Sequence, residues 1–365
     1  MAAEMGLVTF SFFKLRSSAA VIRRLPYLFL QVSTLVNLPP KWTKDRILDH
    51  AVSREKHLRQ ILELITTLVS SDSSSPPLQP YTGYLARIHP SLFYSSSSSS
   101  RPTLSPLALR LYDEEQHILR ESLPDTIVRL RKLLMLSTAT RSLPLHVIDQ
   151  LRFDLGLPTD YKITILPHYP QFFRIHRVPD DERVWLGLVN WEVSLAVPEL
   201  RRDNPENLEF PNRFTRGFGM KRRWLEWLSE WQKLPYISPY EYTPDIDPRT
   251  DISEKRNVGI FHELLHLMIG KKTERKNVSN LRKAFRLPQK FTKVFERHPG
   301  IFYISRKLDT HTVVLREAYG GGKELLRKHP LMEIRDKYIA VLKTGTMEND
   351  NSDCSDEAEE IGFRY

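Results

Sequence analysis

Residues 281–317 decide the fold, and they read LRKAFRLPQKFTKVFERHPGIFYISRKLDTHTVVLRE. Residues 151–188 repeat the pattern as LRFDLGLPTDYKITILPHYPQFFRIHRVPDDERVWLGL. In both stretches a Leu-Arg helix ends in Leu-Pro, and a second amphipathic stretch leads to a proline followed by an aromatic residue. The distance from Leu157-Pro158 to Pro170 matches that from Leu287-Pro288 to Pro299 to within one residue, so the register holds. Repeats set the architecture, and this one predicts a unit used at least twice.

Each unit is predicted to be helix, turn, helix and then a β-hairpin. Residues 301–306 are apolar and β-branched enough for a strand, 309–311 fit a turn, and 312–315 return. In the earlier copy the turn is Pro-Asp-Asp-Glu at 179–182. A weaker third echo is Ile-His-Pro at 88–90 with Phe93. The predicted fold class is therefore α+β, mostly helical, built of tandem winged-helix-like units.

A winged helix often presents basic side chains to nucleic acid, although the same plan also serves as a packing module without a ligand. Composition favours nucleic acid. The chain has 54 Lys and Arg against 44 Asp and Glu, a net charge of +10. The stretch 348–360 holds seven acids and no base, so the rest of the chain carries about +17. Such a body attracts polyanions, while generic surface charge is the alternative.

The chain termini differ from the body in composition. Residues 5–44 contain no acid, and basic residues are spread among apolar ones. This pattern is typical of an organellar presequence, and we expect the mitochondrion, with the chloroplast as alternative. The single cysteine, Cys354, lies in the acidic tail, which excludes an internal disulfide framework. No apolar run is long enough to span a bilayer, so we expect no membrane partner.

The middle of the chain interleaves bases with aromatic residues. Residues 210–223 hold five bases and three aromatics, and a helix with three tryptophans at helical spacing follows. Cations that hold phosphates and rings that stack on bases suit single-stranded RNA. The tryptophans themselves are interpreted as core. The candidate RNA contacts here are Arg213, Arg216, Lys221, Arg222 and Arg223.

The last unit adds a second basic stretch. Residues 278–286 are the candidate recognition helix, and Arg306 and Lys307 lie at the predicted wing. If these bases do not touch RNA, they solvate the outer face. The candidate contacts are Lys271, Lys272, Arg275, Lys276, Arg282, Lys283, Arg286, Arg306 and Lys307.

The strongest enzymatic signal is His262-Glu263-Leu264-Leu265-His266, which matches HExxH. Two histidines at i and i+4 share a helix face and can bind zinc while the Glu acts as general base. A metzincin would have Gly where Ile269 stands and the third His where Lys272 stands. As a glutamate ligand, Glu274 is too close to the motif, and Glu296 falls in the small repeat unit with no supporting pattern. We therefore expect no catalytic residue, no metal site and no cofactor. A zinc metallopeptidase using the HExxH residues remains the alternative. No phosphate loop, dinucleotide fingerprint or nucleophile elbow is present.

Three blocks in order resemble the plant organelle RNA recognition domain family. They are WTKDRILDHAVSREKHL from Trp42, WLEWLSEWQKLPYISPYE from Trp224, and LRKAFRLP followed by RHPGIFYIS. The resemblance covers about residues 40–340. It implies a nuclear-encoded plant protein that binds organellar RNA and promotes splicing of group II introns, with no catalytic or metal residues. The implied partners are intron-containing organellar RNA and other splicing factors; a protein-interaction scaffold is a further alternative.

The resulting organisation has a presequence, a domain and a tail. The predicted segments are a presequence at 1–40, an RNA recognition domain at 41–345 and an acidic tail at 346–365. Within the domain we expect units at 41–110, 111–195 and 250–320, with a basic, tryptophan-rich linker helix at 205–240.

Overall fold

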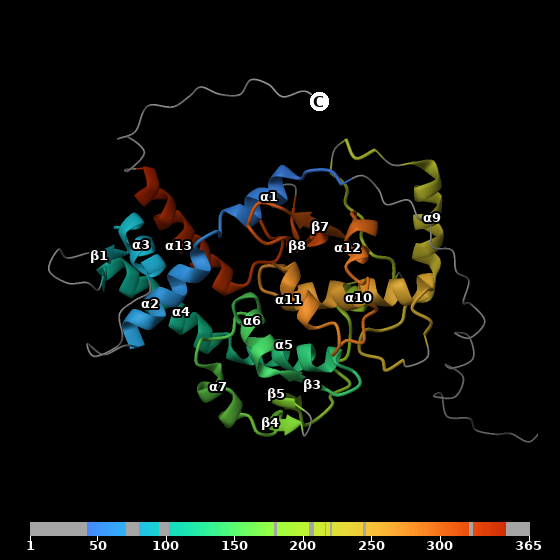
Figure 1. The fold of residues 1–365 in the computed structure, drawn as a ribbon, viewed down its shortest axis with the longest axis horizontal. Coiled ribbons are helices and arrows are strands. Elements are labelled where there is room, and N and C mark those ends of the chain that lie inside the picture. The colour runs from blue at the N-terminus through green and yellow to red at the C-terminus, as the bar shows by residue number, and fades with distance from the viewer. Residues whose placement is uncertain are drawn as a thin grey trace, which may run out of the picture.

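The computed structural model describes residues 42–70, 80–94, 102–178, 181–203, 208–215, 217–219, 221–243, 246–320 and 324–347. The predicted presequence, nearly all of the predicted acidic tail, and Arg216 lie outside these residues. The described chain is α+β and mostly helical, with small antiparallel sheets (Figure 1). Among the described residues, no helix has both the length and the apolar character that crossing a membrane requires.

The first group of elements is a set of helices followed by a short hairpin. It contains α1 (Arg46–Ser53), α2 (Leu58–Ser70), α3 (Pro80–Ile88), β1 (Phe93–Tyr94) and β2 (Thr103–Leu104). The next helix, α4 (Pro106–Glu121), packs with α2 and with the last helix, α13 (Pro330–Met347). A boundary between residues 110 and 111 would therefore fall inside α4.

The second group begins with α5 (Leu123–Leu136), which follows α4 after a break at Ser122. Then come β3 (Ser142–Pro144), α6 (Leu145–Leu155), α7 (Tyr161–Thr164), the 3-10 turn η1 (Leu166–His168), and the hairpin β4 (Phe173–Val178) with β5 (Asp181–Leu188). The sheet order is β3-β5-β4, all antiparallel.

The third group has the same order of elements. It runs through α10 (Asp251–Leu267), β6 (Lys272–Glu274), α11 (Arg275–Asn280), α12 (Lys293–Arg297), β7 (Phe302–Ser305), β8 (Thr312–Leu315) and the 3-10 turn η2 (Arg316–Ala318). Its sheet order, β6-β8-β7, matches that of the second group. Between the two groups lie α8 (Glu199–Asp203) and α9 (Arg222–Lys233).

Backbone conformation repeats with the sequence register. Arg141 and Lys271 occupy equivalent positions of the two copies, and both have a φ of 52° just before the short strand. Gly156 and Arg286, which are also equivalent, have φ of 69° and 54°. Non-glycine residues rarely adopt this left-handed conformation, because it brings their Cβ too close to the following carbonyl oxygen. The two groups therefore share a rarely occupied backbone conformation at the same two positions of the repeat.

The turns before the two Leu-Pro pairs and the starts of the hairpins repeat as well. Backbone hydrogen bonds join Leu157 N to Arg152 O (3.0 Å), at the end of α6, and Leu287 N to Arg282 O (2.9 Å), in the turns after α11. At the start of each hairpin, one backbone carbonyl accepts hydrogen bonds from the N–H groups of the residues three and four positions later. This carbonyl belongs to Tyr169 in the second group and His298 in the third, and His89 does the same in the first. The echo near Phe93 is therefore a third copy of the local geometry.

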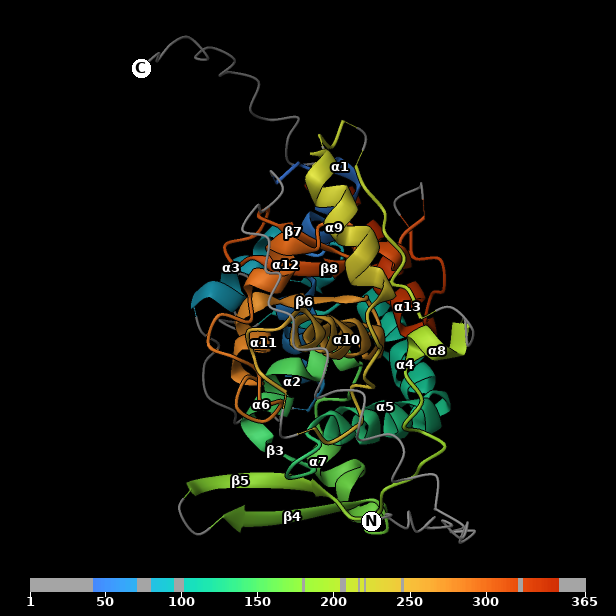
Figure 2. The ribbon, with the colours of Figure 1, turned by 90° about the vertical axis from the view of Figure 1, so that its right-hand side faces the viewer.

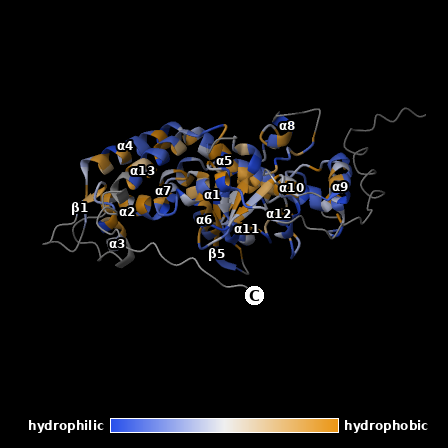
Figure 3. Ribbon diagram, turned by 90° about the horizontal axis from the view of Figure 1, so that it is seen from above, coloured by the Kyte–Doolittle hydropathy of each residue, from blue (hydrophilic) through white to orange (hydrophobic). Residues whose placement is uncertain are grey.

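The second and third groups share one hydrophobic core. A single cluster includes Leu133 of α5, Leu186 of β5, Leu264 of α10, Phe295 of α12 and Val313 of β8. Figure 2 shows α10 end-on in the middle, with the β4–β5 hairpin at one end and the β6–β8–β7 sheet on the other side. Figure 3 shows hydrophobic residues gathered along α5 and α10. A second cluster joins α2, α4 and α13.

One expected helix is shorter than predicted. The candidate recognition helix at 278–286 ends at Asn280, and the chain continues in turns to the left-handed Arg286. Leu281 and Phe285 are buried, so these turns are fixed by the core rather than by helix propensity. The following Leu-Pro pair also disfavours helical continuation.

Candidate nucleic-acid interface

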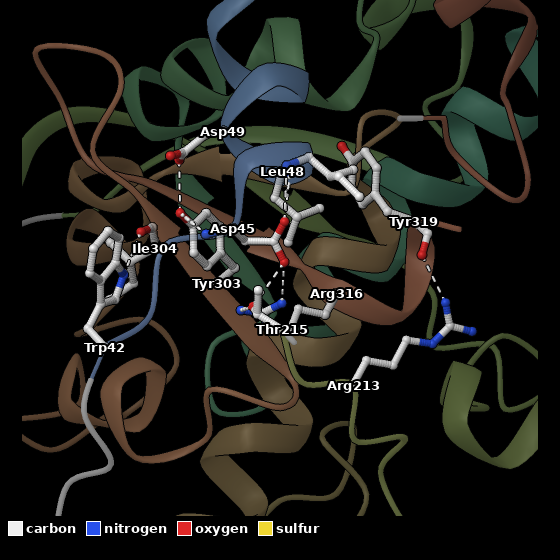
Figure 4. A network of polar contacts seen from close by, with 11 residues as sticks. Trp42, Asp45, Leu48, Asp49, Arg213, Thr215, Tyr303, Ile304, Arg316 and Tyr319 are labelled. Atoms are coloured by element: carbon white, nitrogen blue, oxygen red, sulfur yellow. Dashed lines mark hydrogen bonds and ion pairs between the residues drawn. The ribbon is translucent and has the colours of Figure 1, made fainter. Parts of the chain in front are cut away.

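The start of α1 is fixed by Asp45, which joins three parts of the chain (Figure 4). Its Oδ1 accepts hydrogen bonds from the backbone N–H groups of Ile47 and Leu48, as an N-cap residue does. Its Oδ2 accepts from Thr215 Oγ1 (3.1 Å) and Arg316 Nη1 (2.8 Å). Residues 42–45 are thereby held against η2 and against Thr215. Thr215 belongs to the stretch 210–223, which we call the basic segment.

Trp42 lies on the β7–β8 hairpin. Its Nε1–H donates to the Ile304 carbonyl (3.2 Å), and its ring stacks on Tyr303 with centroids 6.2 Å apart (Figure 4). The Arg306 guanidinium carbon lies 4.8 Å from the indole centroid, within cation–π range. Trp42 is nevertheless 40% exposed, so one large aromatic ring and one cation stand together at the surface.

A cavity of about 300 Å³ opens beside this pair. We call it the Trp42 groove; its lining includes Trp42, Phe218, Arg275, Arg306, His311 and Arg316, together with one acid, Glu296. Arg316 is neutralised by Asp45, whereas Arg275 donates to the hydroxyl of Thr292. Aromatic faces for bases and cations for phosphates are the combination that single-stranded RNA binding uses.

The next residue along, Lys307, lines a second, more open hollow. Lys44, Arg46 and His50 line the same hollow, together with the buried Asp49. Because Arg306 and Lys307 are consecutive and both exposed, the positive surface continues from the Trp42 groove over the hairpin to the start of α1.

A larger cavity of about 570 Å³ includes Pro211 and Arg213 in its lining. We call it the basic cavity; its cations include Arg129, Lys132, Arg202, Arg213, Lys271 and Lys328, and its acids are Asp125, Glu199 and Glu317. The Arg213 guanidinium donates to the Tyr319 carbonyl (2.8 Å). Burial lowers the pKa of Lys271 to about 8. Among the described residues that line the cavity, cations outnumber acids, so the cavity suits an anionic group.

The other predicted contacts differ in how exposed they are. Lys221, Arg222 and Arg223 are exposed at the start of α9, while its tryptophans are buried, as expected for core residues. Lys276, Lys283 and Arg286 are exposed, and Arg282 is half-buried. Lys272 is buried, and its ammonium group forms an ion pair with Glu55 (2.7 Å) inside the protein. The described members of the predicted set therefore differ in exposure, from fully exposed bases to the interior Lys272.

The HExxH residues separate into two sites. Glu263 is fully buried and accepts from Lys132 Nζ (2.7 Å), Tyr240 Oη (2.6 Å) and the Glu199 N–H (2.8 Å). The positive charge of Lys132 contributes to a pKa of Glu263 below its usual value, against the effect of burial. An acceptor held by three donors is not a free general base. His262 and His266 instead both contact Glu317. We did not predict Glu317 from the sequence as a partner of these histidines.

Sequence reasoning missed several groove residues, namely Trp42, Phe218 and His311. Trp42 belongs to a block that marks the family resemblance, which was the one available signal. Phe218 was counted among the aromatics of the basic segment without a role. Nothing local connects either residue to Arg306, because the contacts cross the whole chain.

Comparison with known proteins gives a family match over nearly all of the described chain. Residues 43–347 match the model of the plant organelle RNA recognition domain. No solved structure gives a significant match.

Curated relatives come from both plant organelles. Protein WHAT'S THIS FACTOR 9, mitochondrial, of Arabidopsis thaliana is 32% identical over 346 residues, 87% of this chain and 88% of the relative. The chloroplastic WHAT'S THIS FACTOR 1 homolog of the same plant is 31% identical over 83% of this chain, which spans 63% of that longer protein. Protein ROOT PRIMORDIUM DEFECTIVE 1 is 30% identical over 65% of this chain and 61% of its own length.

Proposed function

Because the chain belongs to the plant organelle RNA recognition domain family, we propose that it binds organellar RNA and promotes splicing of group II introns. Its organelle is the mitochondrion, which a similar relative names, with the chloroplast of other relatives as the alternative. The RNA performs the transesterification. The protein lowers phosphate repulsion and holds the intron in its reactive fold.

The observation that carries this proposal is the pairing of Trp42 with Arg306 over the Trp42 groove. A surface tryptophan that is 40% exposed loses contact with water when a base stacks on it. Arg306, 4.8 Å from the ring centroid, then lies within reach of that nucleotide's phosphate. Stacking tolerates every base, so this groove supplies affinity rather than sequence readout.

Further contacts come from other basic residues of the predicted set. Arg275 lines it, and Lys307 continues the positive surface toward α1. We include the exposed Lys221, Arg222, Arg223, Lys276, Lys283 and Arg286 as phosphate contacts, together with Arg213, Arg216, Lys271 and Arg282. We leave out Lys272, because its ammonium is already paired inside the protein.

The repeated element order supports a tandem arrangement of winged-helix-like units. In each of the second and third groups a helix, a short strand and two short helices precede a hairpin, with the short strand beside the second hairpin strand. On this proposal, β7–β8 is the wing that carries Arg306 and Lys307. The other splicing factors would join the complex on the same intron.

We propose no catalytic role for the HExxH residues, since Glu263 is held by Lys132, Tyr240 and a backbone N–H. The RNA performs the chemistry in this function. A peptidase would need Glu263 free to accept a proton from water.

The experiment that tests the function is immunoprecipitation of the tagged protein from purified plant mitochondria, with sequencing of the bound RNA. We expect enrichment of one or a few intron-containing transcripts, and loss of that enrichment for Trp42→Ala. The same experiment from chloroplasts covers the alternative location. Enrichment of no RNA in either organelle would overturn the proposal.

A further inference from the structure

Two helical histidines and one carboxylate meet at the junction of α10 and η2. His262 Nε2 lies 2.6 Å and His266 Nε2 2.7 Å from the same oxygen, Glu317 Oε1. The three side chains are 2%, 15% and 14% exposed. We propose that His262, His266 and Glu317 form a binding site for one divalent transition-metal ion, with Zn²⁺ as the best fit.

The donor set carries the choice of metal. Two imidazoles and one carboxylate are a standard three-residue set for Zn²⁺ with one position left open. Imidazole also binds other transition metals, whereas Mg²⁺ and Ca²⁺ prefer oxygen-only sites. Selectivity for Zn²⁺ over these hard cations therefore follows from the ligands themselves.

The positions of the atoms need little change to receive an ion. One ligand atom from each residue lies within 4.8 Å of the others. With metal bonds of about 2.0–2.1 Å, tetrahedral ligands stand about 3.3 Å apart. The contacts of 2.6 and 2.7 Å to Glu317 would open by less than about 1 Å, which side-chain rotation supplies. In the metal-free form each Nε2–H donates to Oε1. To bind the ion, each neutral imidazole moves its ring proton to Nδ1, which leaves the Nε2 lone pair free for the metal.

The second carboxylate oxygen supports the same conclusion. Glu317 Oε2 is buried and has no hydrogen-bond partner among the described residues. A buried unpaired carboxylate oxygen is costly, and an ion beside it removes that cost. His266 and Glu317 both line the basic cavity, so the fourth ligand position is reached from that side by water.

The fold does not require these three residues. In the register set by the two Leu-Pro pairs, the earlier copy has Lys132 and Leu136 at the positions of His262 and His266. In the register set by the ends of the two hairpins, it has Asn190 at the position of Glu317. The equivalent helix and hairpin form there without the histidines and the carboxylate. Packing alone therefore does not explain why the three groups coincide in the later copy.

The site binds rather than hydrolyses. Glu263, which would be the general base of a peptidase, is turned toward Lys132 and is fully buried. The ion instead ties α10 to η2, the turn that follows β8 and carries the wing strand into Tyr319. This role is independent of RNA binding and is testable without RNA.

The test is a metal titration of the purified full chain after removal of metal with a chelator. We expect one equivalent of Zn²⁺ per chain and, with Co²⁺ as the probe, the visible absorption of a low-coordinate nitrogen–oxygen site. Glu317→Gln should weaken Zn²⁺ binding by more than about 100-fold, since outer-shell partners alone account for about 10- to 100-fold. The amide oxygen of Gln can still accept a histidine N–H, which preserves the local fold.

Two matched controls separate this site from adventitious binding. His117→Asn removes an exposed histidine paired with Glu121 on α4, and Cys354→Ser removes the single thiol. Both should keep one equivalent of Zn²⁺. Uptake by Glu317→Gln equal to that of the unmodified chain would overturn the proposal, and so would no uptake by the unmodified chain. If Glu317→Gln is unfolded by circular dichroism, the decision passes to the unmodified chain, where Zn²⁺ must raise the unfolding temperature and His266→Asn must abolish that rise.

Discussion

Replacing Trp42 by alanine removes the ring on which a base is proposed to stack. Stacking of one base on an aromatic side chain contributes about 1–3 kcal/mol. At about 1.4 kcal/mol per tenfold, this corresponds to about a 5-fold to 140-fold loss of RNA affinity. Trp42 carries no charge, so the loss should be the same at every salt concentration.

The assay is fluorescence anisotropy of a labelled single-stranded RNA at several salt concentrations. Arg306→Gln in the same assay should lower the slope of log affinity against log salt by about 0.7, the value for one phosphate contact on a single strand. The two variants are thereby distinguished. Trp42→Ala lowers the affinity equally at all salt concentrations, whereas Arg306→Gln changes the slope of log affinity against log salt.

Trp42→Phe is the matched control. It keeps an aromatic face but loses the Nε1–H bond to the Ile304 carbonyl, which costs about 1 kcal/mol of stability. We expect its RNA affinity to remain within about twofold of the unmodified chain. If Trp42→Phe binds as weakly as Trp42→Ala, or if Trp42→Ala binds normally, the stacking argument is wrong.

Three further predictions concern stability and positioning. Glu263→Gln leaves Lys132 without its closest charge partner in the interior, so urea unfolding should show a loss of about 3–5 kcal/mol; a loss under about 1 kcal/mol would contradict the buried pair. Gly300→Ala would place a methyl carbon 2.5 Å from a side-chain oxygen of the adjoining basic segment and should cost about 1–3 kcal/mol and weaken RNA binding, whereas Gly219→Ala meets nothing within 4 Å and should do neither. Burial lowers the pKa of Lys255 to about 8, so the folded chain releases this proton before the unfolded chain does. Stability measured by urea should therefore rise between pH 8 and pH 10, and a flat profile would rule this out.

The repeat made the helices and hairpins predictable from the sequence. Period, Leu-Pro pairs and alternation are local signals, and they placed the two hairpins and the buried tryptophans correctly. The prediction of a recognition helix at 278–286 was wrong in its extent, because tertiary packing ends the helix at Asn280. Leu281 and Phe285 are buried in the shared core, which holds residues 281–286 in turns.

The functional contacts were harder to predict because they join distant residues. Lys272 pairs with Glu55, 217 positions away, so a residue that looks like a surface base is an interior one. Glu317 meets His266 across 51 positions, a pairing that we did not predict from the sequence. Asp45 joins residues from three regions, and its local sequence indicates only a helix cap.

The core that the second and third groups share also determines how the protein can move. Leu186 of one copy and Val313 of the other belong to one hydrophobic cluster, so neither copy can turn without opening apolar surface. The β4–β5 and β7–β8 hairpins are therefore held at a fixed distance from each other. On the proposed function, an RNA that touched both hairpins would need two sites at that separation or would have to bend to create them. The energy of that bending would then contribute to which RNA the protein binds.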